Sequence, residues 1–271
     1  MRTLTTITSI IVLFTTWAAA GEDFEVLFEG HGDIRSYLYF EQDANYFIDT
    51  ELNVSVETFR YKRFYFMIDL FKETHMGRKF NSNMVFDPTR AHWSFGFAGR
   101  IEMDNYFFEA QMHHDCFHDI DRWGDNSVYW NSPRLGFGSL GYLPKYKYHK
   151  PEPDQKSGLW ENKLDYYLLV SFFGPRGGSF QKHHDYKFNL NTDIRYRLLR
   201  HGRWGGDIEM ANLWVLNTDN DIKRQHRLSF NSTFYGNKGV LIVYLRFWPY
   251  DDQSIRSRSD HKFAFGIHLG F

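Results

Sequence analysis

The chain has 271 residues, of which 19% are aromatic and 24% are charged, and its mean hydropathy is −0.52. The aromatic content excludes an intrinsically disordered chain, and the polar average excludes several membrane-spanning helices, each of which needs ~20 mostly apolar residues. The formal net charge is −1 and no strongly basic run is present, which argues against a nucleic-acid partner.

The N-terminus has the three parts of a secretory signal peptide. Arg2 gives a positive start, the stretch from Ile7 to Trp17 is apolar, and three alanines end at Ala20. This order predicts export and cleavage near Ala20. We therefore expect residues 1–20 to be the signal peptide and residues 21–33 to form an N-terminal lead-in.

From residue 34 to the end, the dominant pattern is the alternation of apolar and polar residues that is typical of strands with one apolar face. In 46–58, for example, Ile48, Leu52 and Val54 alternate with Asp49, Glu51 and Asn53. The pattern predicts twelve strands, at 34–41, 46–58, 63–73, 92–102, 106–116, 134–144, 162–173, 186–198, 203–217, 225–235, 240–248 and 261–271.

The predicted strands and their links are typical of a membrane barrel. Many strands reach the ~9–11 residues that a transmembrane strand needs, and the links mostly alternate between long and short. The alternation has two exceptions. The link 42–45 is short where an external loop is expected, and 145–161 is long where a periplasmic turn is expected.

The last segment alternates regularly and ends in an aromatic residue. Phe263, Phe265, Ile267, Leu269 and the terminal Phe271 occupy every second position. This segment resembles the last strand of bacterial outer-membrane β-barrel proteins, which is read by the barrel assembly machinery.

The resemblance to outer-membrane β-barrels extends to the whole chain, because the signal peptide and the single cysteine agree with it. It implies an all-β fold over 34–271: one transmembrane antiparallel up-and-down β-barrel in the bacterial outer membrane, with twelve strands most expected and 10–14 allowed. It also implies that outer-membrane lipids and lipopolysaccharide are partners, and that the assembly machinery binds the strand ending at Phe271. The alternative is a secreted, water-soluble β-sandwich or barrel.

Charged residues of both signs fall on the faces that would line the lumen. Because twelve strands lie between small filled barrels and wide porins, we expect opposite charges to pair across a narrow lumen. The main expected lumen charges are Glu51, Glu57, Asp69, Arg100, Glu109, Lys187, Arg195, Arg197 and Arg227.

Histidines and carboxylates gather near the expected extracellular rim. Imidazole is a common transition-metal ligand, so the rim is a candidate site for a divalent cation, although no recognised zinc spacing is present. The candidate ligands are His113, His118, Asp121, His183 and His184. The alternative interpretation is that these are ordinary polar residues of the rim and loops.

A second hypothesis for the same region is catalytic. His114 and Cys116 form a His-x-Cys pair, which Trp130 and Asn131 follow later in the chain. This pattern resembles the His-x-Ser and later Trp-Asn of outer-membrane phospholipase A, a twelve-stranded barrel. The resemblance implies Cys116 as nucleophile, His114 as base and Asn131 as the residue that orients the histidine. The chain departs from that family in having Cys in place of Ser and a longer interval to the Asn.

Two functions follow from these observations. The leading hypothesis is a non-enzymatic outer-membrane barrel, whose narrow, charge-lined lumen passes or binds a small solute, or which has an architectural role in the envelope. The alternative is a lipid hydrolase at the outer leaflet, with the His/Cys rim of the fifth strand as its active site.

Overall fold

The computed structural model describes residues 23–42, 46–78, 86–120, 127–148, 160–175, 181–182, 186–253 and 261–271. The expected signal peptide, residues 1–20, lies outside these ranges. The strands within them are β1 (Phe24–Tyr39), β2 (Ile48–Tyr61), β3 (Phe64–Arg78), β4 (Phe86–Glu102), β5 (Tyr106–Asp119), β6 (Val128–Ser139), β7 (Trp160–Phe172), β8 (Gln181–Lys182), β9 (Tyr186–His201), β10 (Trp204–Asn217), β11 (Ile222–Tyr235), β12 (Val240–Asp251) and β13 (Lys262–Gly270).

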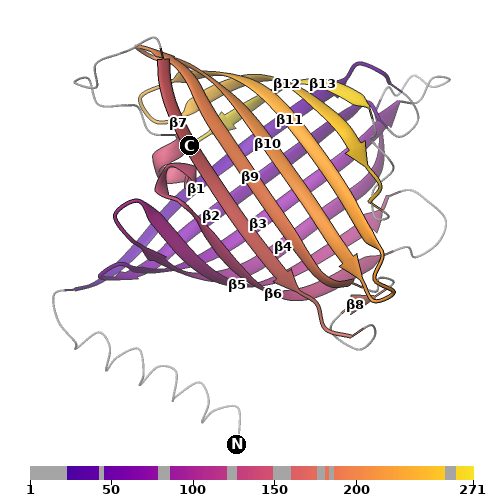
Figure 1. Cartoon of the computed structure of the whole chain (residues 1–271), viewed down its shortest axis with the longest axis horizontal. Helices are drawn as coiled ribbons and strands as arrows, with labels where there is room; N and C mark the ends of the chain where they lie inside the picture. Colours follow the sequence, from indigo (N-terminus) through magenta and orange to yellow (C-terminus); the bar gives the residue numbers. More distant parts are fainter. Residues whose placement is uncertain are drawn as a thin grey trace, which may run out of the picture.

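The strands form one closed antiparallel sheet, drawn in Figure 1. Each long strand pairs with the next long strand in sequence, and β1 pairs with β13, where Ile34 lies opposite Leu269. The two-residue strand β8 only extends the edge beside β6. The predicted fold class is confirmed, because twelve long strands close into an up-and-down barrel and each of them overlaps one predicted range.

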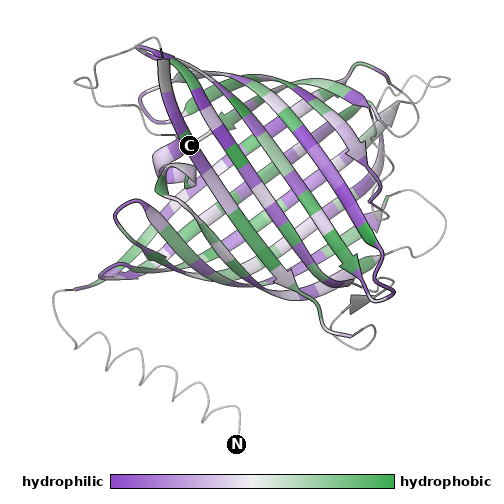
Figure 2. Cartoon of the chain, in the orientation of Figure 1, coloured by the Kyte–Doolittle hydropathy of each residue, from purple (hydrophilic) through white to green (hydrophobic). Residues whose placement is uncertain are grey.

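The alternation of residue types becomes an alternation of faces. On β13, Phe263, Phe265 and Ile267 are 43–47% exposed on the outside, whereas Ala264 and His268 are at most 5% exposed on the inside. Figure 2 shows the resulting bands of hydrophobic and hydrophilic residues along the strands. A closed barrel with an apolar exterior pairs its backbone groups internally, as a chain in lipid requires. The core of this fold is the polar interior.

The two ends of the barrel differ. The short links 62–63, 202–203 and 236–239 lie at one end, together with the C-terminus; we name this the turn end. The opposite end, where β2 begins and β5 ends, is named the loop end. In outer-membrane barrels short turns face the periplasm, so the loop end is the end expected on the extracellular side of such a barrel.

Several boundaries differ from the predicted ones; β4, for example, begins at Phe86 and not at residue 92. Residues Phe24 to Asp33, expected as a lead-in, already belong to β1, which continues past an irregularity between Val26 and Glu29. The sixth strand, expected at 134–144, runs instead from Val128 to Ser139. No helix in the described part of the chain is both long enough and apolar enough to cross a membrane.

Candidate functional site

The segment that follows β6 folds into the barrel at the turn end. It consists of a 3-10 turn, η1 (Leu140–Tyr142), and the short helix α2 (Pro144–Lys147), whose first position is a proline with a φ already suited to a helix. Figure 1 shows both inside the end of the cylinder where the C-terminus lies. We name residues 140–148 the plug.

The plug contacts four strands that lie around the wall. Tyr142 donates to Asp193 of β9 at 2.7 Å, Lys145 pairs with Glu102 of β4 at 2.6 Å, Lys147 pairs with Glu209 of β10 at 3.5 Å, and Tyr148 donates to Asp33 of β1 at 3.1 Å. Because β1, β4 and the adjacent pair β9–β10 lie apart from one another around the sheet, the plug reaches across the lumen. The plug thus narrows the lumen.

Burial changes the ionisation of the plug side chains. Loss of water lowers the pKa of the Lys147 ammonium, although the carboxylate of Glu209 opposes this effect. Burial and the neighbouring Glu102 carboxylate raise the pKa of Tyr146 to about 12. Tyr146 is therefore a neutral hydroxyl at pH 7, able to donate to Glu102.

The expected lumen charges occupy three environments. Glu51, Glu57, Arg100, Glu109 and Arg195 are buried, with 2–8% of their surface exposed. Asp69, Arg197 and Arg227 are half-buried, with 14–20% of the side chain exposed. Lys187 is exposed and donates to Asn220. Ion pairs connect many of these groups. For example, Nη1 of Arg246 on β12 lies 3.5 Å from Oε1 of Glu51 on β2.

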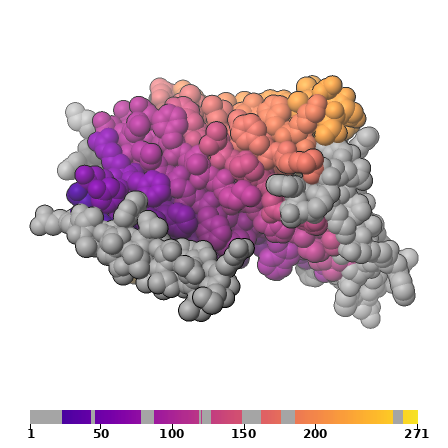
Figure 3. All heavy atoms as spheres, turned by 90° about the horizontal axis from the view of Figure 1, so that it is seen from below, coloured from indigo at the N-terminus to yellow at the C-terminus, as the bar shows by residue number. Residues whose placement is uncertain are grey.

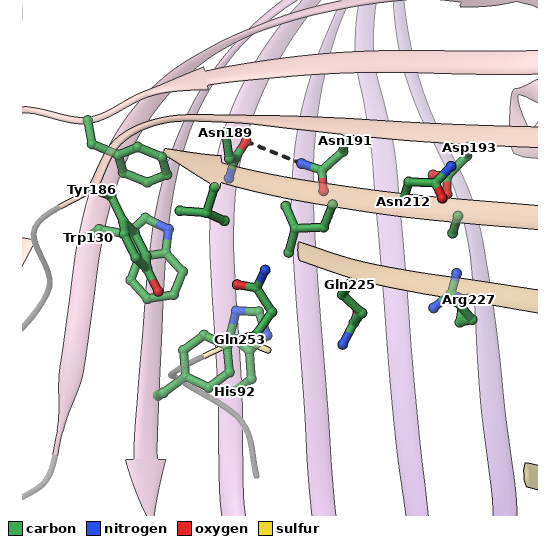
Figure 4. A pocket seen from close by; sticks show the side chains of 15 residues that line it. His92, Trp130, Tyr186, Asn189, Asn191, Asp193, Asn212, Gln225, Arg227 and Gln253 are labelled. Atoms are coloured by element: carbon green, nitrogen blue, oxygen red, sulfur yellow. Dashed lines mark hydrogen bonds between the residues drawn. The ribbon is translucent and has the colours of Figure 1, made fainter. Parts of the chain in front are cut away.

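A cavity of about 290 Å³ lies in the lumen. Its lining is rich in side-chain amides, as Figure 4 shows for Asn189, Asn191 and Gln225, with the charged groups of Asp193 and Arg227 at one side. Asp193 also accepts the hydrogen bond from Tyr142 of the plug. Tyr142 of the plug therefore contacts the lining of the cavity at Asp193.

The outer face of β5 carries the second group of candidate residues. His114 and His118 are exposed and Cys116 is half-buried, and all three are on the same face because they are two residues apart. Cys116 Sγ lies 2.8 Å from His118 Nε2, and His118 Nδ1 lies 2.9 Å from Ser127 Oγ. His114 Nδ1 lies 2.9 Å from Asn131 Oδ1, across the β5–β6 pair.

The predicted catalytic residues are thus brought together in part. The expected contact between His114 and Asn131 is present. The thiol of Cys116, however, contacts His118, which the resemblance to outer-membrane phospholipase A did not assign as a base. The signal was available in the sequence, because period two places residues 116 and 118 on one face.

The strand register shows which residues lie at the same level of the barrel wall as Cys116. Lys72, Trp93, Cys116 and Tyr129 are opposite one another on β3 to β6. Lys72 Nζ lies 4.4 Å from the centre of the Trp93 ring, which is 48% exposed. Trp, Tyr and Lys are typical of the level where lipid headgroups begin. Figure 3 looks onto the outer wall formed by the purple and magenta strands.

The expected metal ligands do not come together where the structure describes them. His113 is buried inside the barrel, where its Nδ1 lies 3.0 Å from Ser94 Oγ, whereas His118 is exposed on the outside. Residues five apart in a strand face opposite sides, so these two cannot share an ion. Asp121, His183 and His184 lie outside the described residues. The interior instead gathers Asp49, Glu73 and His75, with one ligand atom from each within 4.8 Å of the others.

No family model and no curated protein matches the sequence. Among solved structures, a bacterial polysaccharide outer membrane secretin is similar with a TM-score of 0.34 and 11% identity, over 91% of this chain and 99% of that one. BamA from Haemophilus ducreyi lacking POTRA domains 1–3 is similar with a TM-score of 0.29 and 8% identity, over 89% of this chain and 70% of that one. Both likenesses are too distant to bear on function.

Proposed function

We propose that the protein is an outer-membrane enzyme that hydrolyses an acyl ester of an outer-leaflet lipid, with Cys116 as its nucleophile. One observation carries the proposal: Cys116 Sγ lies 2.8 Å from His118 Nε2, while His118 Nδ1 lies 2.9 Å from Ser127 Oγ. A nucleophile within hydrogen-bond reach of a base, itself held by a third group, is the arrangement of covalent acyl-transfer sites.

The chemistry can be written with the groups present. If His118 Nδ1–H donates to Ser127, Nε2 carries the lone pair and takes the proton of the Cys116 thiol. The thiolate attacks the ester carbonyl, the C–O bond breaks, and the imidazolium returns the proton to the leaving alkoxide. Water then cleaves the thioester, giving a free fatty acid and regenerating the thiol.

The second imidazole of the outer face, that of His114, contacts Asn131. Asn131 Oδ1 can only accept, so the neutral form of His114 carries its proton on Nδ1 and keeps a lone pair on Nε2. His114 is therefore the alternative base that the resemblance to outer-membrane phospholipase A implies. His118 is preferred because it contacts the sulfur directly.

The position of the site supports a lipid substrate. On the outer face of β5, the exposed Phe108 and Met112 precede His114, so the site continues the apolar surface that contacts acyl chains. Lys72 and Trp93 lie in the same row as Cys116, where a lipid phosphate would sit. The proposal includes the bacterial outer membrane as location, its lipids and lipopolysaccharide as partners, and recognition of the strand ending at Phe271 by the barrel assembly machinery.

The proposal is tested with the purified barrel and phospholipid vesicles. Fatty-acid release is expected from the wild-type protein and is expected to disappear in Cys116→Ala. Met210→Ala is the matched control, because Met210 is also exposed on the outer wall but belongs to β10, away from the site. Undiminished release by Cys116→Ala would remove the thiol from the mechanism.

The lumen favours one other function, the binding of a small polar solute. The cavity is lined by five side-chain amides together with Asp193 and Arg227, which suits a neutral, hydroxyl-rich ligand. The plug makes binding a better proposal than free passage. A panel of oligosaccharides should raise the unfolding temperature of the wild-type barrel but not that of Asn191→Leu; equal responses of the two proteins would exclude the cavity as the binding site.

A further inference from the structure

A chain of carboxylates and imidazoles crosses the inner wall near the loop end. Asp49 Oδ2 lies 2.9 Å from His75 Nδ1, and Asp115 Oδ1 lies 3.1 Å from His92 Nε2. Between the two pairs lies Glu73, whose side chain is fully buried. Its Oε2 atom is 3.4 Å from His75 Nε2 and 3.7 Å from His92 Nδ1.

The two ring nitrogens that face Glu73 are buried atoms to which the described residues offer no hydrogen bond. Both lie 3.4–3.7 Å from one carboxylate oxygen. Ligand atoms around a tetrahedral metal ion with bonds of ~2.0–2.1 Å are ~3.3–3.4 Å apart, so this spacing is close to that of a coordination sphere.

The other ring nitrogen of each histidine is already held by a carboxylate. Metal-bound histidines usually donate their second N–H to such a group, which fixes the ring and strengthens the ligand. Asp49 also accepts from Tyr39 at 2.9 Å, and the ring of His92 stacks on Phe117 with centroids 3.8 Å apart. Both imidazoles are therefore oriented before any ion binds.

The charges of this cluster allow a bound cation. Asp49, Glu73 and Asp115 are buried, and Arg134 pairs with Asp115. With both imidazoles neutral, three carboxylates and one guanidinium leave two negative charges among these groups. Burying unpaired charge is costly, and either two imidazolium cations or one divalent cation would neutralise this excess.

We propose that Glu73, His75 and His92 bind a divalent transition-metal ion of the zinc class, and that Asp49 and Asp115 orient the two histidines. Imidazole nitrogen with a single carboxylate selects such ions over calcium, which prefers six to eight oxygen ligands. His92 also lines the lumen cavity, as Figure 4 shows, so the ion reaches the site from the lumen. The site is independent of the hydrolase proposal, because Cys116 faces the other side of the wall.

The test is a Zn²⁺ titration of the refolded barrel in detergent by calorimetry. It is run in a Cys116→Ala/His118→Ala background, which removes the thiol and the imidazole that contact each other on the outer face. One equivalent of zinc should bind, Glu73→Gln and His75→Ala should each lower the affinity at least tenfold, and calcium should not compete. His226→Ala is the matched control and should bind as the background does, because His226 lies on β11 and contacts the amide of Asn212 instead.

The outcomes separate the metal site from a purely structural cluster. If His75 and His92 act only as cations paired with carboxylates, zinc affinity will be equal in Glu73→Gln and the background, and the proposal is overturned. Absence of zinc binding in the background protein overturns it as well. Heat-modifiable gel migration reports whether each variant is folded. Should Glu73→Gln fail to fold, the visible spectrum of Co²⁺ added to the background protein tests the site instead. A tetrahedral site of nitrogen and oxygen ligands should give intense bands without thiolate charge transfer, and the absence of such bands overturns the proposal.

Discussion

Tyr148 donates a hydrogen bond from its hydroxyl to Asp33 Oδ2 at 3.1 Å, which joins the link after β6 to the first strand of the barrel. The same hydroxyl lies 3.1 Å from His268 Nε2 on the last strand. One side chain thus contacts both strands of the β1–β13 seam, and the plug is held where the sheet closes.

The plug predicts a low conductance. Wild-type protein in planar bilayers should show little ion current, because residues 140–148 cross the lumen. Replacing 144–148 by a Gly-Ser segment of equal length should give discrete, larger conductance steps. Equal conductance of the two proteins would mean that the plug does not control the lumen.

Buried and exposed arginines should differ in their contribution to stability. Arg100 is 4% exposed and pairs with Glu57 and Glu102, so Arg100→Ala leaves two buried carboxylates and should lower the free energy of unfolding by ~3–5 kcal/mol. Arg60 pairs with Glu25 on the surface, and Arg60→Ala should cost about 0–1 kcal/mol. Urea unfolding in lipid vesicles measures both; similar costs would contradict the buried network.

The apolar exterior predicts an effect that depends on depth. Leu245 lies near the middle of β12 and is 39% exposed on the outside, so Leu245→Arg should lower the free energy of unfolding in vesicles by ~2–4 kcal/mol. Asn237→Arg, in the link between β11 and β12, should change it little. If Leu245→Arg were tolerated as well as Asn237→Arg, that wall would not face lipid.

Much of the fold could be predicted because alternation is a local property of each strand. All twelve long strands overlap predicted ranges, and the outward residues of the last strand are those that the pattern indicates. The plug was missed because Leu140 and Tyr142 alternate with Ser139 and Gly141, which extends the strand pattern beyond Ser139. Pro144, at the first position of α2, was the available signal for a break.

The two candidate sites differ in how far the sequence determines them. The outer site depends on residues two apart on one strand, so period two alone aligns His114, Cys116 and His118. The inner cluster depends on the register of separate strands, in which Glu73 lies opposite His92. Alternation fixes the face of a residue but not its cross-strand partner, so the pattern could not indicate that cluster.

The contact distances predict different consequences for the two outer histidines. Because His118 contacts the sulfur, His118→Ala should reduce fatty-acid release by at least ~10²-fold, the usual contribution of a general base. His114→Ala and Asn131→Ala should cause a smaller loss. Initial rates of release from vesicles measure each effect; the reverse order would return the role of base to His114.

The most direct measurement of the hydrolase proposal is the covalent intermediate on Cys116. The barrel is mixed with a phospholipid, quenched with acid within the first turnover and analysed by intact mass and peptide mapping. An acyl group should appear on the peptide that contains Cys116, should be released by hydroxylamine as a thioester is, and should be absent in Cys116→Ala. Fatty-acid release by Cys116→Ala at the wild-type rate, with no acyl adduct on the wild-type protein, would contradict a thiol nucleophile.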